Sequence, residues 1–203
     1  MSYSIIYADP PWSFGNRQFQ SGGRKPLDLV EAQYKTMPIE DIKALPIKNI
    51  KNKNSVLFIW TTDAHLENAI QVINAWGFKY KTIGFVWLKK YKSGSICYNN
   101  SPYTMKSTEI CLLATSGHVM KMRKSYNVKA FVEDVREKHS KKPDEVRRRI
   151  VEMFGDELPK IELFARSRAD GWDAFGNEIE GGVVLPLSNT ACSGLVGSAP
   201  TSR

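Results

Sequence analysis

The chain has 203 residues, of which 42% are hydrophobic and 25% are charged, a balance typical of a globular domain with its own core. No apolar run approaches the roughly 18 residues that a membrane span requires. The first residues show neither the basic segment nor the cleavage site of a secretion signal, so we expect a cytoplasmic protein. The three cysteines and three histidines are too dispersed to predict a disulfide or a bound metal.

The charge is positive and uneven. The 29 basic and 21 acidic residues leave a net charge of +8, and residues 121–149 alone hold eleven basic and five acidic side chains. One interpretation of this stretch is a solvated helical surface. The other is a surface that faces the phosphates of a nucleic acid. Charge alone does not choose between them.

Five short apolar runs predict strands, at residues 3–8, 56–60, 83–88, 110–115 and 161–165. The runs are mostly continuous rather than alternating, which indicates strands buried on both faces of a sheet rich in parallel pairs.

Helical patterns lie between the strands. The first predicted helix opens at Pro38, with inward Ile42 and Leu45. The second is N-capped by Asp63 and closed by Gly77, and the third opens at Pro143 and stops at Gly155. The inward positions of these two are Leu66, Ile70, Ile73, Val146, Ile150 and Phe154. Strands that alternate with helices predict an α/β sandwich.

We expect one catalytic domain at residues 1–180. Residues 181–203 are small, nearly uncharged and without pattern, so we interpret them as a mostly disordered tail.

Two connections, residues 13–37 and 89–108, are longer than a compact domain usually needs. Both follow strands, and ligands of open α/β sheets bind at the carboxyl ends of strands. Both connections are basic, and the second is also rich in aromatic residues. They supply the candidate nucleic-acid contacts, which are Arg17, Arg24, Lys25, Lys89, Lys90 and Lys92.

The first strand ends in Asp9-Pro10-Pro11-Trp12. The prolines end the strand and hold a stiff extended turn, because proline has a fixed φ and no N–H. The turn combines a carboxylate, carbonyl acceptors and a flat ring. We interpret it as a site for a planar heterocycle with an exocyclic amine. Trp12 would stack on the ring, and Asp9 and the Pro10 carbonyl would accept the amine hydrogens. A base in a duplex would have to be flipped out to reach it. The alternative is a structural turn with a core tryptophan.

The sequence resembles the MT-A-type adenine N6-methyltransferases. The signature ADPPW is followed, in family order, by YKTM, LFIWTT, INAWGF, GFVWLKK, TEICLLATSG, HSKKPDEV and KIELFAR…GW…GNEI, and the likeness covers residues 3–180. It implies a Rossmann-like fold with a circularly permuted motif order and S-adenosylmethionine as the methyl donor.

The resemblance also implies roles for single residues. Asp9, Pro10, Pro11 and Trp12 would form the catalytic motif, and Tyr34 would line the base pocket. Asn177 and Glu178 would bind the ribose hydroxyls of the donor, Lys142 its carboxylate, and Arg166 would line the same site. Arg168 stands where the eukaryotic members carry a histidine.

The resemblance implies an enzyme of the bacterial or phage type that methylates adenine in DNA. Two alternatives stay open, an RNA adenosine methyltransferase and a non-catalytic nucleic-acid-binding member of the family.

Overall fold

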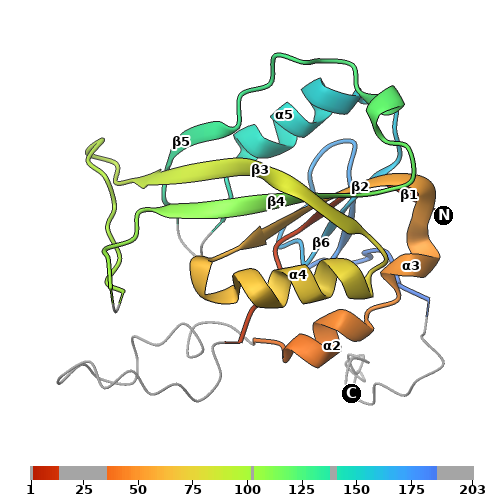
Figure 1. Cartoon of the computed structure of the whole chain (residues 1–203), viewed down its shortest axis with the longest axis horizontal. Coiled ribbons are helices and arrows are strands. Elements are labelled where there is room, and N and C mark those ends of the chain that lie inside the picture. Colours follow the sequence, from red (N-terminus) through yellow and green to blue (C-terminus); the bar gives the residue numbers. More distant parts are fainter. Residues whose placement is uncertain (1, 14–35, 102, 138–140, 187–203) are drawn as a thin grey trace, which may run out of the picture.

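The computed structural model describes residues 2–13, 36–101, 103–137 and 141–186. Its centre is a seven-stranded sheet in the order β5-β3-β4-β2-β1-β6-β7 (Figure 1). β4 runs antiparallel to β2 and β3, and every other neighbouring pair is parallel. The strands are β1 (Tyr3–Ala8), β2 (Lys51–Thr61), β3 (Lys79–Lys90), β4 (Thr108–Ser116), β5 (Phe131–Val135), β6 (Lys160–Leu163) and β7 (Asp173–Phe175).

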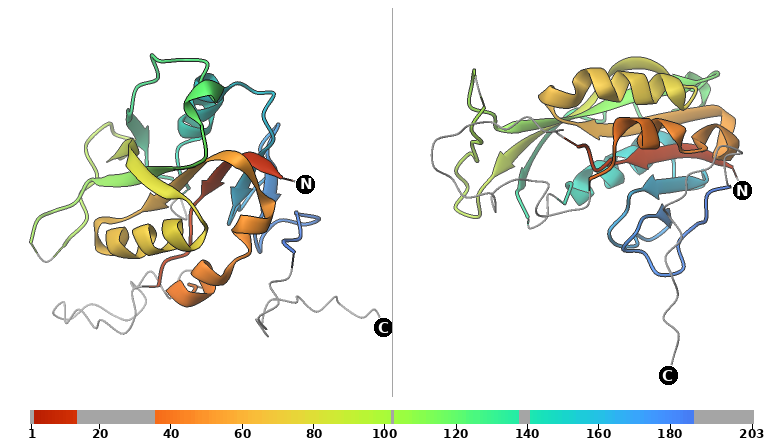
Figure 2. Two further views of the ribbon diagram at one scale, coloured as in Figure 1. Left: turned by 45° about the vertical axis from the view of Figure 1, so that its right-hand side comes forward. Right: turned by 90° about the horizontal axis from the view of Figure 1, so that it is seen from below.

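Helices cover both faces of the sheet (Figure 2). One face carries α2 (Ile39–Ala44), α3 (Ile47–Ile50) and α4 (Leu66–Ala75), and the other carries α5 (Asp144–Phe154). Two short 3₁₀ turns, Asp63–His65 and Met120–Met122, complete the described elements. The predicted α/β class and the mostly parallel sheet are therefore confirmed.

The central strands are buried on both sides, as their continuous apolar runs predict. Successive residues of a strand point to opposite faces. In β2, Val56, Phe58 and Trp60 therefore pack on the side of α5, while Leu57 and Ile59 pack on the side of α4.

The five predicted strands and three predicted helices all form, with the predicted stops at Gly77 and Gly155. Both glycines have positive φ, +76° and +91°, which favours glycine over residues with a side chain. Two details were wrong. Asp63 starts a 3₁₀ turn and makes an ion pair with Lys106, so it does not cap α4. Leu66 is 42% exposed, and α4 buries Ala69, Val72 and Ile73 instead.

The sequence pattern did not predict α3, β5 or β7. β7 has three residues and α3 has four, too few for a hydrophobic period to show. β5 carries Glu133 and Asp134 within the basic stretch, so its sequence lacks the apolar run from which the other strands were predicted.

The first described residues of the expected tail pack on the domain. The N–H of Val183 donates to the carbonyl of Ala174, and Leu185 is buried in the core beside α4. Residues 187–203 lie outside the described residues, so a disordered tail there stays a prediction. Within the described ranges, no helix is long and apolar enough to cross a membrane.

Candidate active site

The Asp-Pro-Pro-Trp turn sits where β1 leaves the sheet. The N–H of Asp9 still donates to the Leu163 carbonyl of β6, at 3.4 Å, and then the prolines end the ladder. Asp9 is thereby fixed at the carboxyl edge of the sheet, with its side chain 23% exposed. The predicted position of the carboxylate is confirmed.

The two proline carbonyls that the sequence offers as acceptors both accept backbone N–H groups. The Pro10 carbonyl accepts the N–H of Trp12 at 2.9 Å, and the Pro11 carbonyl accepts the N–H of Met37 at 2.8 Å. The second bond holds the turn against residues that precede α2. Because a carbonyl oxygen has two lone pairs, the Pro10 oxygen keeps the capacity for one further N–H.

Trp12 is more enclosed than a free stacking platform. Its indole N–H donates to the Trp60 carbonyl at 3.0 Å, and its ring stacks on buried His65 with centroids 5.8 Å apart and planes 16° apart. The ring is 8% exposed. This packing holds the turn rigid, and stacking of Trp12 on a base stays a prediction.

Four charged side chains meet beside this turn, and we call them the edge cluster: Asp9, Lys89, Glu109 and Lys142. The Lys142 ammonium lies 2.8 Å from Asp9 Oδ2 and 3.2 Å from Glu109 Oε2. Lys89 donates to the other oxygen of Glu109. The cluster joins the ends of β1, β3 and β4 and the segment before α5, so it connects the Asp-Pro-Pro-Trp turn to both halves of the sheet.

Three of the four side chains of the edge cluster are almost fully buried. The side chains of Lys89, Glu109 and Lys142 are each 9–10% exposed, and the Lys142 ammonium also lies 5.7 Å from the centre of the Trp60 ring. Buried charges need partners to offset the loss of hydration. Each member of the cluster has one.

Burial and pairing shift the pKa values in opposite directions. Burial raises the pKa of Asp9, and Lys142 opposes the rise without cancelling it. Burial would also raise the pKa of Glu109, but Lys142 and Lys89 outweigh it and lower that pKa. For Lys142, burial disfavours the ammonium, yet Asp9 and Glu109 raise its pKa overall. The cluster therefore keeps Glu109 and Lys142 charged and leaves Asp9 as the more basic carboxylate.

Glu109 is the member to which the sequence assigned no role. The available signal was an acidic residue placed inside an apolar strand run, since an acid there is almost never fully buried without a partner. Trp60 and Trp87, each 1% exposed, are core residues.

The candidate nucleic-acid lysines differ in their surroundings. Lys89 is buried in the edge cluster, where it binds Glu109, which disfavours phosphate contact. Lys90 pairs with Glu133 of β5. Lys92 is exposed beyond the end of β3. Arg17, Arg24, Lys25 and Tyr34 lie outside the described residues, so their roles stay predictions.

Three of the four candidate donor-binding residues lie on the loops after β6 and β7, whereas Lys142 lies before α5 in the edge cluster. Arg166 follows β6, and Asn177 and Glu178 follow β7. Gly176 permits the contact between the two loops, because a Cβ there would lie 2.1 Å from the Ala165 carbonyl oxygen. Phe164 has a φ of +61°, a strained value for a residue with a side chain, and it turns the chain sharply after β6.

These loops border a hollow of about 470 Å³, lined by Arg166, Ser167, Arg168, Glu178, Ile179, Glu180 and Gly181. The Arg166 guanidinium also acts on Asp9, since it helps to lower the pKa of that carboxyl. The hollow therefore lies among the loops that follow β6 and β7.

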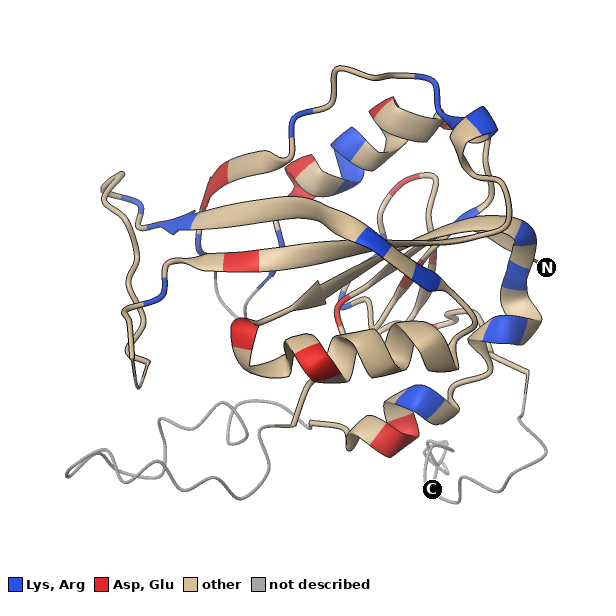
Figure 3. Ribbon diagram, in the orientation of Figure 1, with Lys and Arg blue, Asp and Glu red and all other residues tan. Residues whose placement is uncertain are grey.

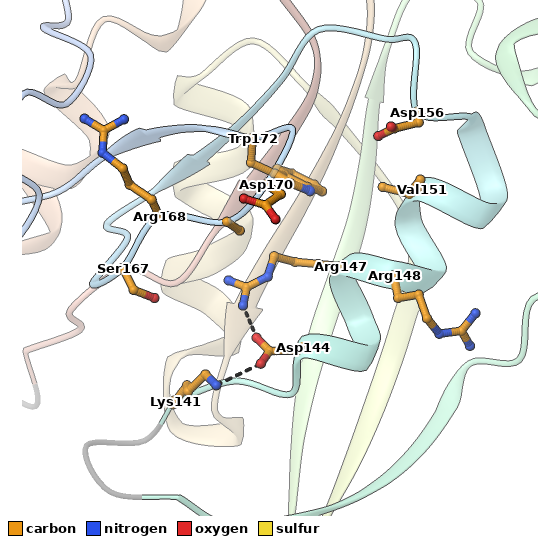
Figure 4. A pocket seen from close by; sticks show the side chains of 11 residues that line it. Lys141, Asp144, Arg147, Arg148, Val151, Asp156, Ser167, Arg168, Asp170 and Trp172 are labelled. Carbon is orange, nitrogen blue, oxygen red and sulfur yellow. Dashed lines mark hydrogen bonds and ion pairs between the residues drawn. The ribbon is translucent and has the colours of Figure 1, made fainter.

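A second hollow, of about 580 Å³, lies between α5 and residues 167–172 (Figure 4). Asp144 is one of its lining residues and pairs with Lys141 and Arg147. Arg147 also donates to Glu162 of β6 at 2.6 Å. These ion pairs hold the start of α5 against the sheet. Lys142, which directly precedes α5, is thereby positioned in the edge cluster.

Within the basic stretch 121–149, the arginines of α5 are paired with acids. Arg148 and Arg149 both bind Glu145 on α5, Arg148 also pairs with Glu152, and Lys124 pairs with Glu157. Blue and red alternate along this helix (Figure 3). The solvated-surface interpretation fits α5 better than a phosphate-facing one.

Comparison with known proteins shows the family of the chain. The MT-A70 family model matches residues 3–178. The Type II methyltransferase M.MunI of Mycoplasma sp is 35% identical over 188 residues, which cover 87% of this chain and 78% of that protein. The N6-methyladenosine RNA methyltransferase MTA1 of Pyricularia oryzae is 24% identical over 189 residues, 88% of this chain and 47% of that protein. With its Asp-Pro-Pro-Trp turn at the sheet edge, the chain belongs to the MT-A70 family of methyltransferases.

Proposed function

We propose that this protein methylates N6 of a flipped-out adenine in DNA with S-adenosylmethionine as the donor. The observation that carries the proposal is the position of Asp9. Its carboxylate belongs to the edge cluster at the carboxyl end of β1, where Lys142 holds it, in a chain of a methyltransferase family.

Asp9 and Pro10 suit the amine of adenine. The lone pair of an aromatic amine is delocalised into its ring, so the nitrogen is a poor nucleophile. Two acceptors on its hydrogens favour a pyramidal nitrogen and localise the lone pair. Asp9 has oxygen lone pairs beyond the one that faces Lys142, and Pro10 has one beyond the Trp12 bond. When the nitrogen forms its bond to the methyl carbon, the bond from that carbon to the donor sulfur would break and the donor would leave as a neutral thioether. Asp9 would accept the proton that the amine then loses.

The residues around the smaller hollow suit the donor. MT-A70 methyltransferases generally use S-adenosylmethionine, which supplies a methyl group on a positive sulfonium. Its diol suits Glu178, which lines the hollow, and Asn177, which precedes Glu178 in the chain and does not line the hollow. Its carboxylate suits a cation. The hollow of about 470 Å³ falls within the range of small-ligand sites.

Lys142 is the cation that the family resemblance assigns to the donor carboxylate. In the structure Lys142 faces Asp9 and Glu109. We infer that Lys142 serves both sides: it orients Asp9 and reaches the donor carboxylate from the same place.

DNA is favoured over RNA by the more similar relative. That relative bears the name of a Type II methyltransferase, the designation of DNA-modifying enzymes, at 35% identity over 78% of its length. The RNA methyltransferase is 24% identical and is covered over 47% of its length. A flipped adenine looks alike in both polymers apart from the sugar, so RNA is the second candidate.

The test is to express the protein in a host that lacks adenine methylation and to digest the host DNA and RNA separately to nucleosides. We expect N6-methyldeoxyadenosine in DNA. The Asp9→Ala variant is the control and should produce none. N6-methyladenosine in RNA with unmodified DNA would assign the enzyme to RNA instead. Modification of neither polymer would leave the non-catalytic alternative.

A further inference from the structure

The connection between β3 and β4 projects from the sheet as an arm, and we use this name for residues 91–107, of which all but 102 are described. It extends beyond the carboxyl end of β3 at the left of Figure 1. Tyr91 and Ser95 close a turn, and the N–H of Cys97 donates to the Lys89 carbonyl at 2.8 Å. Further out, Asn99 and Lys106 exchange two backbone hydrogen bonds of 2.7 and 2.9 Å. The arm thus has a backbone framework of its own.

The arm exposes large apolar side chains that the fold does not use. Tyr103 is 97% exposed, Met105 61% and Tyr98 50%, with Tyr91 at 49% and Ile96 at 38%. Scattered exposed apolar residues are ordinary, but several gathered on one projecting segment mark a contact surface. Buried Cys97 anchors the base of the arm, so its rings are exposed on a held segment.

The charge of the arm indicates a polyanion as the partner. Residues 91–107 contain Lys92 and Lys106 and no acidic residue; Lys106 is paired with Asp63, which lies outside the arm. Figure 3 shows blue and no red beyond the ends of β3 and β4 on this side. A second copy of this chain would also carry a net charge of +8, so repulsion disfavours it as the occupant. Flat rings beside lysines suit nucleic acid, because bases stack on aromatic side chains while cations meet phosphates.

The arm begins at the catalytic site. Lys89 precedes it and Glu109 follows it, and these two residues are paired in the edge cluster. Glu109 lies 3.2 Å from Lys142, which lies 2.8 Å from Asp9. A nucleic-acid strand with one base at Asp9 therefore has its neighbouring bases within reach of the arm.

We propose that the arm holds the DNA next to the flipped adenine by inserting or stacking the rings of Tyr98 and Tyr103 against the bases that the adenine leaves. Extrusion of a base breaks its stacking and leaves a gap in the duplex, and apolar side chains wedge between base steps in proteins that distort DNA. This inference rests on the proposed function, and it adds the part of the chain that stabilises the flipped state.

The test uses the full chain with radiolabelled S-adenosylmethionine and genomic DNA from a host without adenine methylation. The double variant Tyr98→Ala/Tyr103→Ala should raise the KM for DNA about tenfold or more and leave the donor Kd, measured by calorimetry, unchanged. Tyr98→Phe/Tyr103→Phe keeps the rings and should behave like the wild type. Tyr80→Ala/Tyr126→Ala removes two exposed tyrosines outside the arm and should also have no effect.

The outcomes separate the two proposals. If the wild type methylates DNA and the alanine double variant has an unchanged KM for DNA, the arm has no such role. If the wild type sediments as a dimer and the alanine double variant as a monomer, the arm is a contact between copies and the inference is wrong. If the wild type methylates RNA and leaves DNA unmodified, the proposed function fails and this inference fails with it.

Discussion

Lys142 donates to the carboxylates of Asp9 and Glu109 at once, and this shared cation links the reactive carboxylate to the frame of the site. Glu109 is in turn held by Lys89. A single Asp–Lys pair could rotate, whereas a chain of four alternating charges from four separate segments holds Lys142 from two sides. The buried cluster therefore serves positioning as much as charge.

Replacement of Asp9 by alanine should lower kcat about 10²–10⁴-fold, the usual contribution of a positioned acid or base. Donor affinity should stay near normal, because a group that acts on the target amine contributes mainly in the transition state. Single-turnover kinetics and calorimetry measure the two quantities. Glu40→Ala, an exposed acid on α2, is the matched control. Near-normal turnover in Asp9→Ala would refute the assignment.

We expect the loss of kcat at low pH, which is the acid limb of the pH–kcat profile, to follow the protonation of the Asp9 carboxylate. Burial raises its pKa above the ordinary 3.8 and Lys142 lowers it, so activity is lost as the pH falls through a raised value. In Lys142→Met the opposing cation is gone, and the limb should move to still higher pH.

The measurement is the pH dependence of kcat at saturating donor and DNA in both proteins. Arg148→Met, which removes an exposed cation on α5, should leave the limb in place. A limb at the same pH in Lys142→Met and the wild type would mean that another group sets it.

Glu109→Gln should destabilise the protein by roughly 3–5 kcal/mol, since it leaves the buried Lys89 ammonium without its counterion. The pKa of Glu109 is lowered from 4.5. Its contribution to stability is therefore full above pH 4.5 and is lost as the pH falls through the lower folded value.

Urea unfolding of the wild type and of Glu109→Gln at several pH values tests this. The difference in the free energy of unfolding between the two proteins should be constant near neutral pH and should become smaller in acid. A difference that becomes larger in acid would contradict the assigned direction of the shift.

At the scale of elements, the sequence predicted those strands and helix ends whose position depends on the spacing of apolar residues or on a turn residue. The runs around Phe58 and Leu112 and the glycines at 77 and 155 placed the central strands and the ends of α4 and α5 correctly. β7 was missed because three residues show no period. The edge cluster was missed because its members lie far apart in sequence and only the strand order brings them together. The carboxylate at the end of β1 was predictable because its prolines act locally.

A half-buried ion pair joins α5 to β6, in addition to the apolar residues that α5 buries on the sheet. Arg147 donates to Glu162, with side chains 16% and 13% exposed, and burial raises the pKa of Glu162 while Arg147 opposes it. Arg147→Ala should cost about 3 kcal/mol or more, because an uncompensated carboxylate stays buried. Arg147→Met/Glu162→Leu should recover most of that loss.

Thermal unfolding of these variants measures the effect. Arg148→Ala is the control on the same helix. Its side chain is 63% exposed, and a change at such a surface site usually stays within about 0.5 kcal/mol. Equal losses in Arg147→Ala and Arg148→Ala would show that the pair with Glu162 does not hold the helix.

At the scale of the whole molecule, the net charge of +8 predicts attraction to nucleic acid, and the structure narrows where that attraction arises. Arg148 and Arg149 of α5 are paired with acids of the same helix, and Lys89 is buried. Lys92 on the arm is exposed, and within the described part of the chain no ion pair holds it. The charge density that DNA meets is therefore set by pairing inside the fold more than by the count of basic residues.

The salt dependence of DNA binding should distinguish the exposed Lys92 from the paired arginines of α5. For each phosphate that the protein no longer neutralises, the slope of log K against log salt becomes shallower by about 0.9. Lys92→Ala should reduce the slope by about that amount, because its ammonium is available to a phosphate. Arg148→Ala should leave the slope unchanged, because Glu145 and Glu152 already neutralise its guanidinium. Fluorescence anisotropy with a labelled duplex at several salt concentrations measures both. A larger reduction of the slope for Arg148→Ala than for Lys92→Ala would place the DNA on the α5 face and away from the arm.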